Sequence, residues 1–108
     1  MSFTGEQTSR TAADGLRTQS VGELNFAHMQ AFVDDVVTVT EAEIREAMRR
    51  MIFGARLVPE PSGAVALAGA LFRRELLPSA RQTVAIMSGG NVEPSVLRSA
   101  LEDEGSVF

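Results

Sequence analysis

Two short runs rich in β-branched residues, set far apart in the chain, do most to constrain what this sequence can fold into. They are Val36-Val37-Thr38-Val39 and Thr83-Val84-Ala85-Ile86-Met87. β-branched residues favour strands, and apolar residues on both faces are typical of buried, parallel strands. Helical patterns fill the chain between them, so the sequence predicts an α/β fold with both strands parallel in one sheet. Because two strands are too few for a sheet, we expect a partial parallel sheet with flanking helices, part of a larger one.

Four helical patterns surround these runs, over residues 22–32, 40–54, 62–77 and 94–101. The second begins with a capping box, in which Thr40 and Glu43 satisfy each other's backbone N–H groups, and Gly54 marks its expected end. The third is rich in alanine and glycine, which predicts close packing against neighbouring backbones. Its expected stop is Pro78.

The pattern divides the chain into three parts. Residues 1–20 are polar and predict a loose lead-in or a loop that needs a neighbour. Residues 21–104 carry the predicted strands and helices and form the partial α/β domain. Residues 105–108 form a polar tail.

Composition excludes several kinds of chemistry. The 108 residues suit one small domain, and they include neither cysteine nor lysine, since all ten basic residues are arginine. Disulfides, thiolate metal sites and a lysine nucleophile within this chain are therefore excluded. The net charge of −4 argues against nucleic-acid binding. No apolar run has the length of a membrane span, and the start lacks the features of a signal peptide, so we expect a cytoplasmic protein.

The loop after the second run is the first candidate site. Ser88-Gly89-Gly90-Asn91 follows a predicted strand directly, and ligands of open α/β sheets bind beyond the carboxyl ends of strands. Paired glycines allow a ligand to approach the backbone closely. The same four residues also suit an ordinary turn that needs positive φ angles, and the pattern alone leaves both interpretations open.

Other polar residues carry weaker signals. Glu60 precedes Pro61 at a predicted helix start, where a carboxylate favours the positive end of the helix dipole or points into a cleft. Asp14-Gly15 is typical of a turn. The single histidine, His28, lacks partners for a metal site, and no metal ligands are predicted.

Taken together, five stretches resemble the C-terminal third of the threonine/serine dehydratase family of pyridoxal-phosphate enzymes, which includes serine racemases. In order along the chain they are TAADGLR (11–17), VGELNF (21–26), FVDDVVTVTEAEIREAMR (32–49), LVPEPSGAVALAGAL (57–71) and VAIMSGGNV (84–92). The resemblance implies the fold-type II architecture, with pyridoxal phosphate held between two α/β domains. This chain would supply the end of the large domain.

The resemblance also implies roles for individual residues. Ser88 would hydrogen-bond the pyridine nitrogen of the cofactor, and Gly89 and Gly90 would make room for the ring. Gly15 would lie against the cofactor through its backbone, and Glu60 would sit near the ring edge. A neutral hydroxyl cannot hold the ring nitrogen protonated as an aspartate would, which suits elimination of a β-hydroxyl group.

The family's Schiff-base lysine, phosphate-binding glycine loop and acidic cation site have no counterpart in these residues, so no catalytic residue is assigned. We therefore expect a fragment of a dehydratase, or a split subunit completed by an N-terminal partner chain, with no activity alone. A non-catalytic remnant that serves as an interaction or small-ligand module, including through self-association, is the alternative. The substrate amino acid is not determined.

Overall fold

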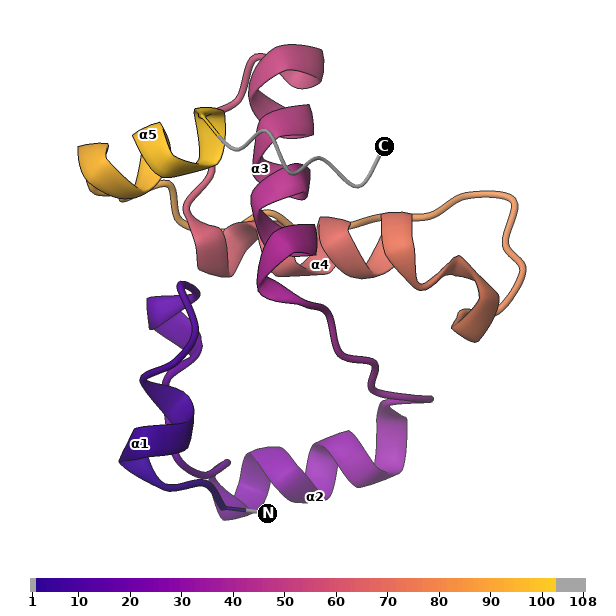
Figure 1. Cartoon of the computed structure of the whole chain (residues 1–108). Coiled ribbons are helices and arrows are strands. Elements are labelled where there is room, and N and C mark those ends of the chain that lie inside the picture. The colour runs from indigo at the N-terminus through magenta and orange to yellow at the C-terminus, as the bar shows by residue number, and fades with distance from the viewer. Residues whose placement is uncertain (1, 103–108) are drawn as a thin grey trace.

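Two crossing helices form the centre of the computed structural model, which describes residues 2–102. Helix α3 (Glu41–Ala55) crosses α4 (Pro61–Phe72), and α5 (Pro94–Leu101) packs against α3 (Figure 1). The contact buries a small apolar core, which consists of Ile44, Ala47, Met48, Met51, Ala64, Ala68 and Ala100. Alanine supplies four of these seven residues, so the helix backbones approach closely, as the composition of the third predicted helix indicates.

Helix α3 begins where the capping box predicts. The Thr40 hydroxyl accepts a hydrogen bond from the Glu43 N–H at 3.1 Å, and the Glu43 carboxylate accepts one from the Thr40 N–H at 2.8 Å. The expected stop at Gly54 is wrong by one or two residues. The helix continues to Ala55, and Arg56 adopts the left-handed conformation at its end, with φ of 58°.

Helix α4 starts at Pro61, which needs no hydrogen-bond partner for its nitrogen at the first helical position. It ends at Phe72, earlier than the expected stop at Pro78. Arg73 leaves the helical conformation with φ of −126°, and a single 3-10 turn, η2 (Arg74–Leu76), follows. The side chain of Arg73 bonds back to the start of α3, which accounts for the break.

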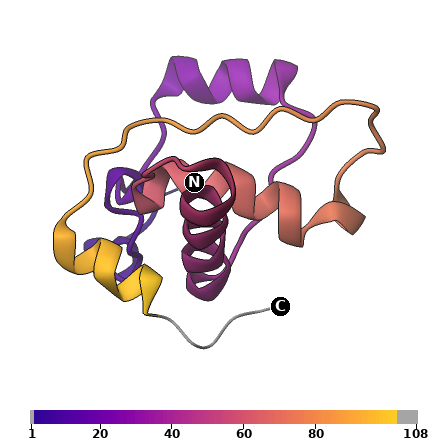
Figure 2. The ribbon, with the colours of Figure 1, turned by 90° about the horizontal axis from the view of Figure 1, so that it is seen from above.

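The predicted pair of parallel strands is absent from residues 2–102. The chain is neither helical nor paired in a sheet over residues 33–40, here called the first open segment, or over residues 77–93, the second open segment. Figure 2 shows the second open segment drawn out past α4. A strand needs a neighbouring backbone to satisfy its N–H and C=O groups, and neither segment meets one.

The N-terminal residues form a loop that closes on itself. It contains α1 (Gly5–Thr8) and the 3-10 turn η1 (Asp14–Leu16), and an isolated bridge joins Ser2 to Ser20. The Phe3 N–H also donates to the Gln19 carbonyl at 2.6 Å. The polar lead-in is therefore ordered by its own backbone contacts and by its neighbours. The boundary at residue 20 stays a prediction, and the predicted tail at 105–108 lies outside the described residues.

Helix α2 (Glu23–Phe32) forms where the sequence predicts it, but it buries none of its residues. Leu24 and Phe32 are 78% and 79% exposed. Figures 1 and 2 show α2 set apart from α3 and α4. No helix within residues 2–102 is long and apolar enough to cross a membrane.

Candidate functional site

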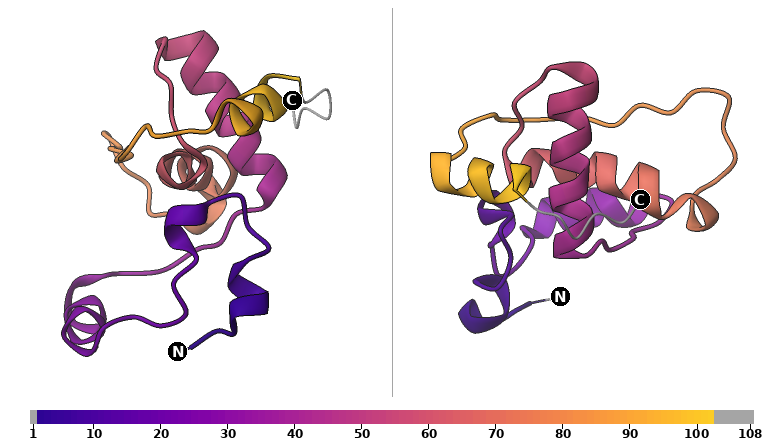
Figure 3. Two further views of the ribbon diagram at one scale, coloured as in Figure 1. Left: turned by 90° about the vertical axis from the view of Figure 1, so that its left-hand side faces the viewer. Right: turned by 45° about the horizontal axis from the view of Figure 1, so that its top comes forward.

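The start of α4 is the point where the candidate site residues meet. Glu60 lies directly before the helix, and the loop 88–90 contacts the first turn. The turn η1, which contains Gly15, lies beside α4 (Figure 3). Two segments that are far from α4 in the sequence, η1 and the loop 88–90, therefore converge on residues 60–63.

Glu60 connects the helix start to the glycine loop. Its Oε1 atom accepts a hydrogen bond from the Gly90 N–H at 2.8 Å. The carboxylate makes no capping bond to its own helix, so its main contact lies across the site. Gly89 and Gly90 have φ angles of 75° and 126°, which only glycine adopts readily. A Cβ atom on Gly89 would lie 1.6 Å from Glu60 Oε1. The positive φ angles that the turn interpretation requires are therefore present, whereas the approach of a ligand to this backbone stays a prediction.

Gly63 brings the backbone of Ser88 directly onto α4. A Cβ atom at position 63 would lie 2.2 Å from the Ser88 carbonyl oxygen, closer than any real contact. Only glycine at this position allows the loop to sit there. The sequence signal for this contact is a glycine in the first turn of an otherwise good helix, where alanine would be favoured.

Ser62 holds the turn that carries Gly15. The Gly15 N–H donates to the Ser62 hydroxyl at 2.8 Å, and the Ala12 N–H donates to the Glu41 carboxylate at 3.0 Å. The η1 turn is therefore attached to the starts of both central helices. Neither Ser62 nor Gly63 was a predicted site residue, although both lie within the EPSG stretch.

Ser88 presents a neutral hydroxyl at this junction. The residue is exposed, as are Gly89 and Gly90, whereas Glu60 is half-buried. No hydrogen bond links the Ser88 side chain to another described residue. The arrangement is an open wall with one hydroxyl, two glycine backbones and a fixed carboxylate. It offers no lysine nucleophile, because the sequence contains no lysine.

The remaining polar candidates lie elsewhere. His28 is on the exposed helix α2, where Nδ1 lies 2.7 Å from the Leu24 carbonyl oxygen. The Asp35 carboxylate accepts a hydrogen bond from the Val36 N–H at 2.8 Å. Within residues 2–102, no group of three or more histidine, aspartate or glutamate side chains is placed to hold a metal ion.

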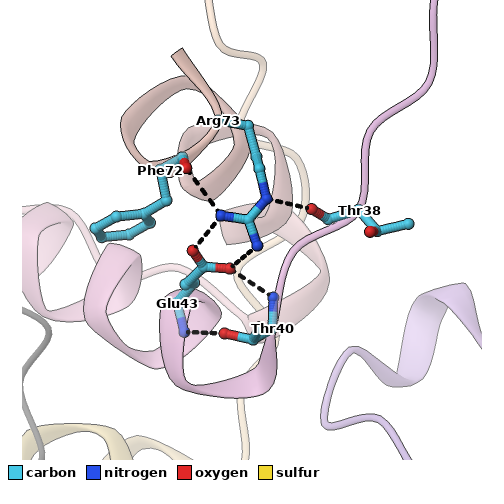
Figure 4. Close-up of polar contacts among 5 residues, drawn as sticks. All are labelled: Thr38, Thr40, Glu43, Phe72 and Arg73. Carbon is cyan, nitrogen blue, oxygen red and sulfur yellow. Dashed lines mark hydrogen bonds and ion pairs between the residues drawn. The ribbon is translucent and has the colours of Figure 1, made fainter. Parts of the chain in front are cut away.

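A partly buried ion pair stabilises the frame that carries the site (Figure 4). Arg73 donates from Nη1 to Glu43 Oε2 at 2.6 Å and from Nη2 to Glu43 Oε1 at 2.7 Å, and its Nε donates to the Thr38 carbonyl at 2.9 Å. Burial by itself raises the pKa of Glu43, but the hydrogen bonds from Thr40 and Arg73 outweigh it and leave the pKa below its ordinary value. The pair joins the start of α3 to the end of α4.

The family model for pyridoxal-phosphate dependent enzymes matches residues 2–89, which include η1, all of α4 and the loop up to Gly89. This chain belongs to that family. The match confirms the family resemblance of the five sequence stretches and implies pyridoxal phosphate as the cofactor of the intact enzyme.

Individual relatives agree with this assignment. The chain is 38% identical over 94 residues to the catabolic L-threonine dehydratase of Escherichia coli (strain K12). The matched region covers 86% of this chain and 29% of the dehydratase. It is 44% identical over 91 residues to a serine racemase of Arabidopsis thaliana, and this match covers 79% of the chain and 27% of the racemase. The crystal structure of the T.th. threonine deaminase is similar to this structure, with a TM-score of 0.70 and 42% sequence identity. The superposition covers 78% of this chain and 28% of the deaminase chain. The chain thus spans under a third of the length of these relatives.

Proposed function

We propose that this chain forms the ring-binding wall of a pyridoxal-phosphate-dependent threonine or serine dehydratase, as a fragment or as one part of a split enzyme. The observation that carries the proposal is the convergence of Gly15, Glu60 and Ser88–Gly90 on the first turn of α4. These are the residues that the family resemblance places at the cofactor.

The wall has the chemistry that a pyridine ring requires. Two glycine backbones without side chains offer a surface against which a flat ring can lie. The Ser88 hydroxyl is a neutral donor and would hold the ring nitrogen without adding a charge. Glu60 would hold the loop in place through its hydrogen bond with the Gly90 N–H. The close contact of Gly63 with the Ser88 backbone would fix the distance of Ser88 from α4.

The cofactor, when bound, supplies an electron-withdrawing ring, which supports loss of the β-hydroxyl group from a hydroxy amino acid. The chain's own residues bind and orient that ring. No lysine occurs among the 108 residues, so the amine that the family uses has to come from another polypeptide segment. We therefore expect no turnover by this chain alone.

The first test measures the chain by itself. Purified chain is incubated with pyridoxal phosphate and L-threonine, and the visible absorbance of bound cofactor and the formation of 2-oxobutanoate are followed. Neither signal is expected. Formation of the ketoacid by the chain alone would contradict the proposal.

The second test supplies the missing part. The probe is a polypeptide containing the T.th. threonine deaminase sequence outside the match. We expect the mixture to retain the cofactor, and Ser88→Ala to weaken retention about tenfold, which corresponds to one hydrogen bond. Ser79→Ala, at an exposed position in the second open segment, is the matched control and should change nothing. Equal retention of the cofactor by the parent chain, Ser88→Ala and Ser79→Ala would show that Ser88 does not bind the cofactor.

The exposed apolar residues of α2 and of the first open segment favour a second candidate, a non-catalytic interaction module. Leu24 and Phe32 of α2 and Val36 of the first open segment are each at least 70% exposed. An interaction module would associate with the probe or with itself but would never retain pyridoxal phosphate. Cofactor retention in the mixture therefore separates the two functions.

A further inference from the structure

A pocket with a volume of about 210 Å³ lies between α3, α5 and the start of α4. Three buried apolar residues, Ile44, Met48 and Pro61, line its inner part. The half-buried Val96 of α5 lines it from the other side. None of the residues that the family resemblance places at the cofactor lines this pocket. It is therefore separate from the wall described above.

Helix α5 is anchored to α3 through its C-terminal end. The Arg49 Nη1 atom donates a hydrogen bond to the Leu101 carbonyl oxygen at 2.7 Å, and Ala100 is the one buried residue of α5. Residues 95–99 of the same helix include no buried side chain, and they border the pocket instead. A ligand of matching shape in the pocket would therefore contact both helices.

Polar groups gather where the pocket opens. Arg45, Ser95 and Ser99 line both the pocket and an adjoining surface depression, which Arg98 and Glu102 also line. Among these residues two guanidinium groups outnumber one carboxylate, so the opening is positive in a chain whose net charge is −4. Guanidinium and hydroxyl groups donate hydrogen bonds that a carboxylate accepts. The opening thus favours an anionic group over an ammonium group.

The volume limits the apolar part of a ligand. A protein cavity of roughly 150 Å³ holds one benzene molecule. The pocket is somewhat larger than that, but it is smaller than the roughly 300 to 1,000 Å³ of sites for drug-sized ligands. A small molecule with about six carbons therefore fits it better than a peptide does.

We propose that this pocket binds a small monocarboxylic acid with an apolar body of about six carbons. The apolar body would lie against Ile44, Met48 and Val96, and the carboxylate would lie at the opening near Arg45 and Arg98. The inference goes beyond the proposed function and does not depend on it, because it uses none of the residues proposed to bind the cofactor. A bound acid would add a connection between α3 and the N-terminal part of α5.

The test titrates the full chain with hexanoate at neutral pH and follows its backbone amides by NMR. We expect saturable shifts at residues 44–48 and 95–99. Acetate carries the charge without the apolar body, and it should bind at least about tenfold more weakly because it buries fewer methylene groups. Hexanamide has the same body without the charge, and it should also bind about tenfold more weakly. Added salt should weaken hexanoate binding, because the opening is exposed to solvent.

Two substitutions at exposed positions separate the two parts of the site. Arg98→Gln removes a charge at the opening and should weaken hexanoate binding about tenfold while leaving hexanamide binding unchanged. Ser99→Leu fills space in the pocket and should weaken binding of both ligands at least about tenfold. Arg81→Gln, at an exposed position of the second open segment, is the matched control and should bind hexanoate as the parent chain does.

Circular dichroism checks that each variant still folds, and Arg98→Gln decides the question if Ser99→Leu does not. Absence of a saturable shift with hexanoate would overturn the proposal. Binding of acetate or hexanamide as tightly as hexanoate would overturn it too, because the ligand would then need only one of the two features. Equal affinity of Arg98→Gln and Arg81→Gln for hexanoate would show that the positive opening does not select the ligand, and would also overturn it.

Discussion

The Glu60 carboxylate and the Gly90 N–H form a 2.8 Å hydrogen bond between the start of α4 and the loop 88–90, which lies within the second open segment. The bond joins residues that are 30 positions apart in the sequence. It occupies a carboxylate that would otherwise be free to cap its own helix. The loop geometry of Ser88 therefore depends on a residue outside the loop.

Removing this carboxylate should release the loop. We expect Glu60→Ala to lower the free energy of unfolding by about 1 kcal/mol, the net value of one such hydrogen bond. Exchange of the Gly90 amide should accelerate in parallel. Glu60→Gln retains an acceptor oxygen and should show a smaller loss, as measured by urea unfolding and amide exchange. Identical behaviour of the two variants would mean that the bond does not hold the loop.

Two glycines of α4 should respond in opposite directions to the same change. Gly63→Ala forces a Cβ atom against the Ser88 carbonyl and should destabilise the chain by about 1 to 3 kcal/mol, as overpacking does. At Gly69 the nearest atom to a new Cβ is Val37 Cγ2 at 3.8 Å, which is ordinary contact. Gly69→Ala should therefore gain about 0.5 to 1 kcal/mol from helix propensity. Thermal unfolding of the pair tests this difference.

The small core should depend on Met48, whose exposure is 1%. Met48→Ala leaves a cavity between α3 and α4 and should cost about 2 to 5 kcal/mol. In a core of this size, that loss is expected to abolish cooperative unfolding. Met29→Ala on the exposed helix α2 is the control and should cost less than about 0.5 kcal/mol. Similar losses for the two variants would show that α2 is packed as tightly as α3.

Stability should fall in acid because of Glu43. Its folded-state pKa lies below the ordinary value, so its contribution is complete above the unfolded pKa and is lost as pH falls through the folded pKa. Protonation would leave the half-buried Arg73 without its ionic partner. Chemical unfolding from neutral pH downward should show this decline, and Glu43→Gln should remove the part that comes from this group. An unchanged pH profile in that variant would exclude Glu43 as the source.

Local sequence signals were enough for the helices. Thr40 and Glu43 predict the start of α3 because a capping box needs only neighbouring residues. Pro61 predicts the start of α4 for the same reason. The ends were less certain: Arg56 rather than a glycine takes the left-handed position, and α4 stops early because Arg73 turns toward Glu43, a partner 30 residues away.

The sheet could not be settled from the sequence. The open segments have strand composition, but a strand exists only where another backbone completes its hydrogen bonds. Within residues 2–102 no such backbone is present, so the runs at 36–39 and 83–87 remain open. Composition thus indicated what these runs prefer, and the absence of a neighbour decided what they form.

By itself the sequence determined the helices, the lack of lysine and the family resemblance, because each depends on residue identity or on short-range spacing. Only the tertiary structure placed Ser62 and Gly63 between Gly15 and Ser88. The contact of Ser62 with Gly15 joins residues 47 positions apart, and the contact of Gly63 with Ser88 joins residues 25 positions apart. The tertiary structure also left the runs at 36–39 and 83–87 unpaired where the sequence predicts a sheet. The contacts of α4 and the unpaired runs have the same physical reason. Contacts between distant segments form only where the folded chain brings two backbones together.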